Sequence, residues 1–107
     1  MNEDPSPSPT HEQVMTALRE VIDPEVGLNI VDLGLIYDVR FDGRRVHVTF
    51  TLTTPGCPMQ YAMAEGIRRA VLELSSVEDC EVHLVWDPPW NPSMISEEGR
   101  EILGSNP

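Results

Sequence analysis

The sequence contains no lysine and has few basic residues of any kind. All seven of its basic side chains are arginine, and they stand against 18 aspartates and glutamates, so the formal net charge is −11. Binding to a phosphate backbone needs clustered positive charge, so we expect no nucleic-acid partner. No apolar run is long enough to span a bilayer, and the first residues lack a secretory signal pattern. We therefore predict a cytoplasmic protein with no membrane partner.

The usual motifs of metal and nucleotide chemistry are also missing. The two cysteines, Cys57 and Cys80, do not make a disulfide framework, which agrees with a reducing compartment. The sequence has no Cys-x-x-Cys, His-x-x-x-His or His-Glu-x-x-His spacing and no Gly-rich phosphate loop. We expect His11, His47 and His83 to be solvated rather than to be ligands. These absences exclude a recognisable zinc motif and nucleotide hydrolysis within this chain.

The chain has the length and composition of one small domain. It has 107 residues, of which 40% are hydrophobic, enough for a single core. Residues 1–9 are rich in Pro and Ser and contain no large apolar side chain except Met1, so we predict a disordered tail. Residues 10–107 are predicted to form the single domain.

The first half of this domain predicts a helix and a β-hairpin. Thr10 and Gln13 have the spacing of a capping box, and the helix that they begin should end at Asp23-Pro24, because a residue before Pro disfavours the α region. After a loop at 23–30, residues 35–41 and 46–53 alternate with period two. Asp42-Gly43 is a favoured hairpin turn and would pair Phe41 with Arg44 and Val39 with Val46.

The second half predicts a long helix, a strand and a short last helix. Pro58 suits the first position of a helix that ends at Ser75-Ser76, residues 80–86 alternate as a strand, and residues 93–103 form the last helix. A β-α-β crossover is right-handed and makes its two strands parallel. The fold class is therefore α+β, in the order α-β-β-α-β, with a small mixed three-stranded sheet covered by helices and a short C-terminal helix.

Cys57 is the residue of greatest chemical interest. It would cap the helix that begins at Pro58, and the partial positive charge of a helix N-terminus favours a thiolate. A free cysteine is more often a small buried hydrophobe, but the flanking Pro55-Gly56 and Pro58 indicate a surface loop. Cys80 shares the parity of Val82 in its strand and is expected in the core.

An acidic loop is predicted to lie beside this cysteine. Antiparallel pairing of the hairpin brings the start of its first strand to the end of its second, so Asp32 and Gly34 should lie near Thr54 and Cys57. Taken singly, Asp23, Glu25, Asp32 and Asp87 are each better explained as turn or cap residues. The predicted neighbourhood nevertheless joins carboxylates to a candidate thiolate, with no histidine base nearby.

Three motifs in this order resemble the metal–sulfur cluster biosynthetic family. They are Asp23-Pro24-Glu25, then Val31-Asp32-Leu33-Gly34-Leu35-Ile36, then Thr54-Pro55-Gly56-Cys57-Pro58. The resemblance covers about residues 11 to 104, and the ending Trp86-Asp87-Pro88-Pro89-Trp90 is most similar to the SufT-type branch. It implies a small α+β fold in which Cys57 is the functional thiolate. Around it the resemblance implies a supporting loop of Asp23, Glu25, Asp32, Gly34, Thr54, Pro55, Gly56 and Pro58.

The resemblance implies an accessory factor for iron–sulfur cluster assembly and protein maturation, which is not itself an enzyme. Its partners would be iron–sulfur assembly proteins and apo client proteins. Cys57 would bind iron or a cluster transiently, with a second copy of the chain in a homodimer as one source of further ligands, because one thiolate does not complete the usual four-cysteine set. Two alternatives remain open: a pure protein–protein adaptor with a structural cysteine and an exposed patch at Trp90, and a thiol-dependent enzyme.

Overall fold

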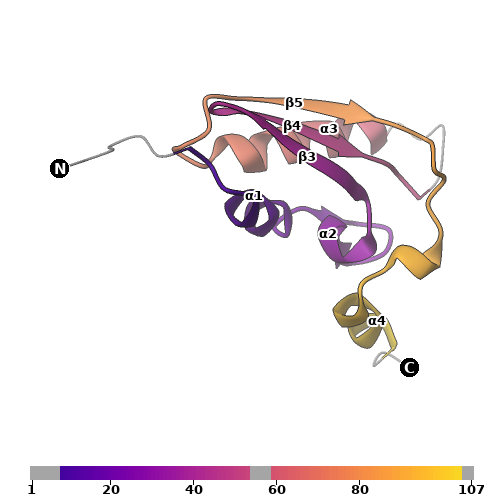
Figure 1. Cartoon of the computed structure of the whole chain (residues 1–107). Coiled ribbons are helices and arrows are strands. Elements are labelled where there is room, and N and C mark those ends of the chain that lie inside the picture. Colours follow the sequence, from indigo (N-terminus) through magenta and orange to yellow (C-terminus); the bar gives the residue numbers. More distant parts are fainter. Residues whose placement is uncertain (1–7, 54–58, 105–107) are drawn as a thin grey trace.

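The computed structural model describes residues 8–53 and 59–104, and its centre is a three-stranded mixed sheet. The strands are β3 (Ile36–Asp42), β4 (Arg45–Phe50) and β5 (Asp79–Leu84), in the order β3-β4-β5. β3 and β4 pair antiparallel, and β4 and β5 pair parallel across the connection that contains α3 (Met59–Leu72). The predicted mixed sheet is therefore confirmed, with β4 in its middle (Figure 1).

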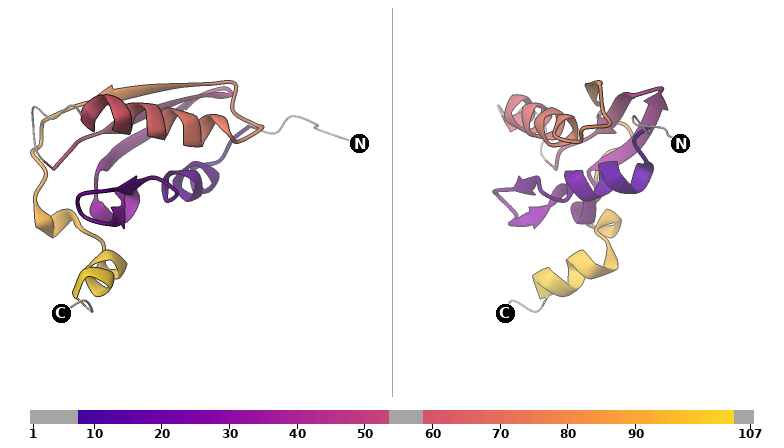
Figure 2. Two further views of the ribbon diagram at one scale, coloured as in Figure 1. Left: turned by 180° about the vertical axis from the view of Figure 1, so that it is seen from behind. Right: turned by 90° about the vertical axis from the view of Figure 1, so that its left-hand side faces the viewer.

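Two helices cover one face of this sheet. α1 (His11–Leu18) begins at the predicted capping box, in which Gln13 and Thr10 exchange hydrogen bonds between side chain and backbone. Figure 2 shows α1 and α3 on the same side of the strands. The inward side chains of β4 and the buried faces of these helices form one core, whose members include Val14, Leu18, Val46, Val48, Phe50, Met63, Ile67, Val71 and Cys80.

From Asp38 onward the hairpin keeps its predicted faces but not its predicted register. Phe41 pairs with Val46 and Val39 with Val48, two residues along from the expected pairing. The reason is the position of the turn. Asp42 belongs to the strand and pairs with Arg45, so the two-residue loop begins at Gly43 instead of Asp42. Gly43 has a φ of 63°, where glycine is favoured. Because a shift of two residues preserves side-chain parity, Val39 still faces inward.

A β-bulge near the start of β3 was not predicted from the sequence. The register shifts between Ile36 and Asp38, so that Tyr37 is the extra residue and Ile36 lies opposite Phe50. The extra residue shifts the alternation, so Ile36 and Val39 both lie opposite core residues of β4, and Tyr37 has no cross-strand partner among the described residues of β4. Its hydroxyl donates instead to the Pro88 carbonyl at 2.8 Å. The bulge therefore directs Tyr37 toward the C-terminal segment.

The predicted first helix is too long, and the loop after it is more structured than expected. α1 ends at Leu18, because the Val21 carbonyl accepts a hydrogen bond from the Ile30 amide at 3.0 Å. This bond continues a short antiparallel ladder of β1 (Ile22–Asp23) and β2 (Leu28–Asn29). The one-turn helix α2 (Ile30–Leu33) follows directly. A residue before proline can end a helix, but α1 ends before Asp23 is reached, because residues 22–23 pair with β2 instead.

The C-terminal segment crosses back below the sheet. β5 ends at Leu84, two residues before the predicted strand end, and the predicted last helix is divided into a 3-10 turn η1 (Pro92–Met94) and α4 (Glu97–Gly104). Arg100 of α4 donates to the carbonyls of Ser93 at 3.0 Å and Ile95 at 3.1 Å, which holds the two pieces together. In Figure 1 α4 lies beyond α2, away from the strands.

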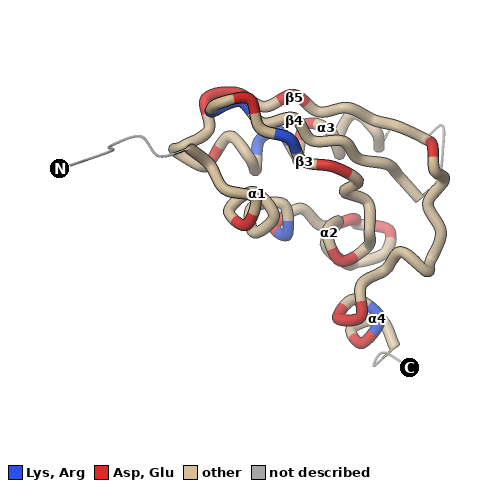
Figure 3. Tube along the Cα trace, viewed as in Figure 1, with Lys and Arg blue, Asp and Glu red and all other residues tan. Residues whose placement is uncertain are grey.

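Acidic residues are spread over the described part of the chain. Figure 3 shows Asp and Glu on α1, α2, α4 and the strands, with Arg in smaller number among them. Among the described residues, no helix is both long enough and apolar enough to cross a membrane.

Candidate functional site

Asp23 holds the turn between β1 and β2. Its side chain is 1% exposed, and its Oδ1 accepts from the backbone amide of Glu25 at 2.8 Å and that of Val26 at 3.4 Å. Its carbonyl accepts from the Gly27 amide at 2.7 Å. An Asp that accepts from its own following amides forms a local turn of this kind. The expectation that Asp23 is a turn residue agrees with this geometry.

Asp32 connects α2 to the start of α4. Asn29 Nδ2 donates to its Oδ2 at 2.7 Å, and Ser96 Oγ donates to its Oδ1 at 2.8 Å. The Asp32 carbonyl also accepts from the Ser96 amide at 2.7 Å, while Ser96 Oγ accepts from the Gly99 amide at 2.9 Å and so caps α4. Both carboxylate oxygens of Asp32 are therefore engaged within the protein, and the residue joins two segments that are far apart in the sequence.

Gly34 ends α2 in a conformation and a position that favour glycine. Its φ is 85°, in the left-handed region that residues with a Cβ rarely adopt. A Cβ at this position would lie 2.9 Å from the carbonyl carbon of Met94 and closer still to its oxygen. Asp32 already connects α2 to the C-terminal segment, and the close approach of Met94 to Gly34 adds a second contact between them.

Trp90 reinforces the same connection. Its indole Nε1 donates to the Leu33 carbonyl at 2.7 Å, and its ring packs against the core from a partly buried position. The adaptor alternative expected an exposed apolar patch that includes Trp90. The structure gives this side chain a packing role instead, whereas the neighbouring Trp86 is the more exposed of the two.

The start of β3 lies beside the residues that follow β4, as the hairpin predicted. The Thr51 amide donates to the Leu35 carbonyl at 2.9 Å, which places the Gly34–Leu35 junction next to the chain that leads to Thr53. Thr54, Pro55, Gly56, Cys57 and Pro58 lie outside the described residues. The predicted contact of Asp32 and Gly34 with this segment therefore stays a prediction.

Cys80 is a core residue, as its strand parity predicted. It is 2% exposed and has no disulfide partner. Burial is the main cause that raises the pKa of its thiol to about 11, with nearby Arg68 opposing the shift and Asp79 and Glu81 adding to it. A neutral thiol in the core does not act as a ligand or nucleophile near neutral pH. Any thiol chemistry of this chain is thus left to Cys57.

The buried thiol predicts that the protein loses stability in alkali. Between pH 9 and 11 an unfolded chain ionises Cys80 while the folded chain does not, so the stabilisation is complete below pH 9 and is lost as pH rises toward 11. The shift corresponds to about 2–3 kcal/mol. Urea unfolding at several pH values should show this fall in wild type and a smaller one in Cys80→Ala. Equal pH slopes in the two proteins would contradict the prediction.

The sequence reasoning missed a cluster on the outer face of the sheet. His47, Glu81 and His83 each present one potential ligand atom, and these atoms lie within 4.8 Å of one another. The expectation for the two histidines was that each would be solvated alone. The signal was available: Glu81 and His83 have i, i+2 spacing on β5, and the parallel pairing sets His47 opposite Glu81.

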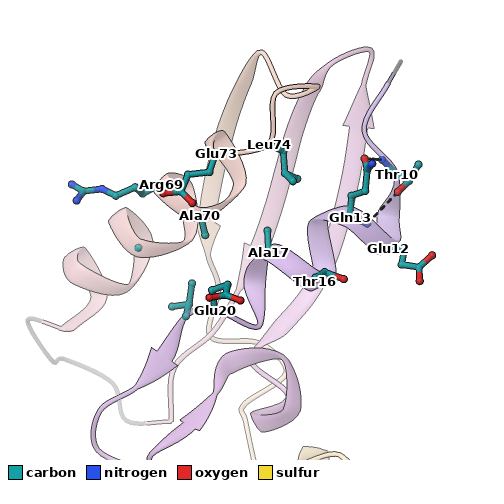
Figure 4. A pocket seen from close by; sticks show the side chains of 12 residues that line it. Thr10, Glu12, Gln13, Thr16, Ala17, Glu20, Arg69, Ala70, Glu73 and Leu74 are labelled. Carbon is teal, nitrogen blue, oxygen red and sulfur yellow. Dashed lines mark hydrogen bonds between the residues drawn. The ribbon is translucent and has the colours of Figure 1, made fainter. Parts of the chain in front are cut away.

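A groove of about 1000 Å³ separates α1 from α3. Figure 4 shows Glu12, Glu20, Glu73 and Arg69 around it, with Ala17 and Ala70 between them. None of the described residues of the predicted site lines this groove. The groove is therefore separate from the acidic loop and from the outer-face cluster.

Comparisons with known proteins identify relatives of this chain. The family model described as iron–sulfur cluster assembly protein matches residues 11–84. The Fe-S protein maturation auxiliary factor YitW of Bacillus subtilis is 44% identical over 94 residues, which are 87% of this chain and 92% of that protein. The maturation factor SufT of Staphylococcus aureus is 42% identical over 85 residues, 78% of this chain and 97% of that protein.

A solved structure supports both the fold and the relationship. The crystal structure of a domain of unknown function from Bacillus anthracis superposes with a TM-score of 0.82 at 36% identity, covering 87% of this chain and 90% of that one. The family model spans α1, β1, β2, α2, α3 and the whole three-stranded sheet. This chain belongs to the family of iron–sulfur cluster assembly proteins.

Proposed function

We propose that this protein assists the maturation of iron–sulfur proteins, as an accessory factor rather than as an enzyme. The observation that carries the proposal is the similarity to two maturation auxiliary factors across nearly their whole lengths. This chain covers 92% and 97% of those two proteins. Its partners would then be cluster assembly proteins and apo client proteins in the cytoplasm.

Cys57 is the residue that we propose handles the cargo, which would be iron or an iron–sulfur cluster. α3 begins at Met59 among the described residues, two positions after Cys57 in the sequence. A cysteine near a helix N-terminus has its thiolate favoured, and the thiolate is the form that binds iron. Cys80 is a poor alternative because its thiol is buried and neutral.

A single thiolate needs further ligands, and these are part of the proposal. Iron–sulfur clusters usually have four cysteine ligands, so a second copy of the chain or a client would supply the others. Within the described residues, Glu25 is exposed and its carboxylate makes no hydrogen bond, whereas Asp23 and Asp32 are engaged in local structure. Glu25 is therefore the carboxylate of the predicted loop that is available to the cargo.

Anaerobic reconstitution with iron and sulfide tests the role of Cys57. Wild type and Cys80→Ala should both show the visible absorption of a thiolate-bound cluster, and Cys57→Ser should lose it. In cells that lack the native gene, Cys57→Ser should leave the activity of an iron–sulfur enzyme at the level of the deletion strain, while Cys80→Ala restores it. Full restoration by Cys57→Ser would show that the thiolate does not carry cargo and would favour the adaptor.

A further inference from the structure

The face of the sheet opposite the core carries a compact group of metal-binding side chains. His47 on β4 and Glu81 and His83 on β5 project from this face, where neither α1 nor α3 covers the strands (Figure 2). The side chains of His47 and His83 are 32% and 51% exposed, so solvent and ions have access to them. This group shares no residue with the predicted loop around Cys57.

The strand pairing explains why the three side chains meet. His47 lies directly opposite Glu81 in the parallel ladder, and His83 lies opposite Thr49, two residues further along both strands. The imidazole rings of His47 and His83 stack with 5.8 Å between their centres and 11° between their planes. Glu81 lies within reach of both rings, because its Oε1 is 3.7 Å from His47 Nδ1 and 3.7 Å from His83 Nε2. Each ligand is therefore held by a strand rather than by a loop.

The spacing of these atoms suits a single metal ion after small side-chain movements. The three candidate ligand atoms lie within 4.8 Å of one another, and Oε1 of Glu81 is 3.7 Å from a nitrogen of each ring. Bond lengths of about 2.0–2.2 Å place the ligands of a tetrahedral zinc ion about 3.4 Å apart. Rotation of exposed side chains can close the difference without moving the backbone.

The surroundings leave room for the remaining ligands of an ion. A hollow of about 500 Å³ beside the two rings is lined by Asp38, Arg40 and Thr49 as well as by His47 and His83. Arg40, which lies opposite His47 in the β3–β4 ladder, is paired with Asp38 at 3.0 Å. Water could therefore complete the coordination sphere while the Arg40–Asp38 pair stays intact.

We propose that His47, Glu81 and His83 bind one divalent first-row transition-metal ion on the outer face of the sheet. Two imidazoles and one carboxylate with open positions are a donor set found at iron(II) and zinc sites in proteins. The imidazoles select against Mg²⁺ and Ca²⁺, which take oxygen ligands. The site is independent of the proposed role of Cys57, because it uses none of the residues of that loop.

Calorimetric titration of the apo full-length chain with Zn²⁺ tests this site. Wild type should bind one ion per chain at the site. His47→Gln or His83→Gln should weaken this binding by about 10- to 100-fold or more. Removal of a residue that only hydrogen-bonds to a metal ligand already has an effect of this size. The third histidine offers a matched control, since His11 is exposed on α1 and His11→Gln should bind as wild type does. Cys57→Ser should also retain the site, and Mg²⁺ should give no binding heat there.

Imidazole ¹⁵N spectra provide a second measurement that does not depend on affinity. Addition of Zn²⁺ should shift ring nitrogens of His47 and His83 but not those of His11. The proposal is overturned if wild type binds no Zn²⁺ at millimolar concentration, or if His47→Gln and His83→Gln bind it as tightly as wild type. Loss of all Zn²⁺ binding in Cys57→Ser alone would overturn it as well, because the thiol would then be the metal ligand.

Discussion

Gly34→Ala is expected to destabilise the protein by about 2–5 kcal/mol. A non-glycine residue in the left-handed region costs roughly 1–2 kcal/mol, and Gly34 has a φ of 85°. The new Cβ would also approach the backbone of Met94, which cannot rotate away as a flexible side chain could. Overpacking of this kind adds roughly 1–3 kcal/mol. Urea unfolding followed by circular dichroism measures the sum.

Gly43→Ala is the matched control, because it changes the backbone term alone. Gly43 has a φ of 63°, and a Cβ there would meet no atom within 4 Å. Its cost should therefore stay near the roughly 1–2 kcal/mol of the left-handed conformation. If the two variants lose equal stability, the C-terminal segment does not press on Gly34 as the structure indicates.

The sequence was sufficient to predict the parts of the fold that depend on local pattern. Alternation identified β3 and β4, the capping box identified the start of α1, and the β-α-β order predicted that β5 runs parallel to β4. The predicted register was wrong by two residues because the two-residue turn begins one residue later than expected. Moving the turn by one residue changes each cross-strand partner by two and so preserves which side chains face inward. Such an error moves cross-strand partners but leaves the buried face unchanged.

The parts that could not be predicted depend on contacts between distant segments. The bulge at Tyr37 accompanies a hydrogen bond to the Pro88 carbonyl, and the end of α1 is followed by the bond between Val21 and Ile30. Neither partner can be identified from a local window of sequence. The tight approach of Met94 to Gly34 is likewise visible only once the C-terminal segment has been placed.

The same distinction applies to the candidate site. Asp23 and Asp32 were identified as residues of the acidic loop, and the structure uses both in turns and caps, as short polar side chains commonly are. The outer-face cluster was missed because each histidine was considered by itself, whereas pairing of β4 with β5 is what brings His47 to Glu81. Motif spacing along one segment does not report ligands that two strands contribute jointly.

Asp32→Ala is expected to cost about 2–4 kcal/mol, because it removes two hydrogen bonds to a carboxylate and leaves their donors without a partner. The donors are Asn29 Nδ2 at 2.7 Å and Ser96 Oγ at 2.8 Å. Asp32→Asn keeps an acceptor for Ser96 but places an amide donor against Asn29. Its loss of stability should therefore be about half that of Asp32→Ala. Asp38→Ala is the surface control: Asp38 pairs with an Arg40 side chain that is 80% exposed, and such pairs contribute only about 0–1 kcal/mol.

Hydrogen exchange separates a general loss of stability from the specific loss that this network predicts. Ser96 caps α4 through the Gly99 amide while it donates to Asp32, so removal of the carboxylate frees the cap as well as the contact with α2. Exchange in Asp32→Ala should therefore accelerate most at the amides of Gly99 and Arg100, ahead of those in β4. Equal acceleration throughout the protein would mean that Asp32 contributes to the core but does not dock α4. Preferential opening of α4 would instead identify the C-terminal segment as a separately stabilised unit that the Asp32 side chain holds against α2.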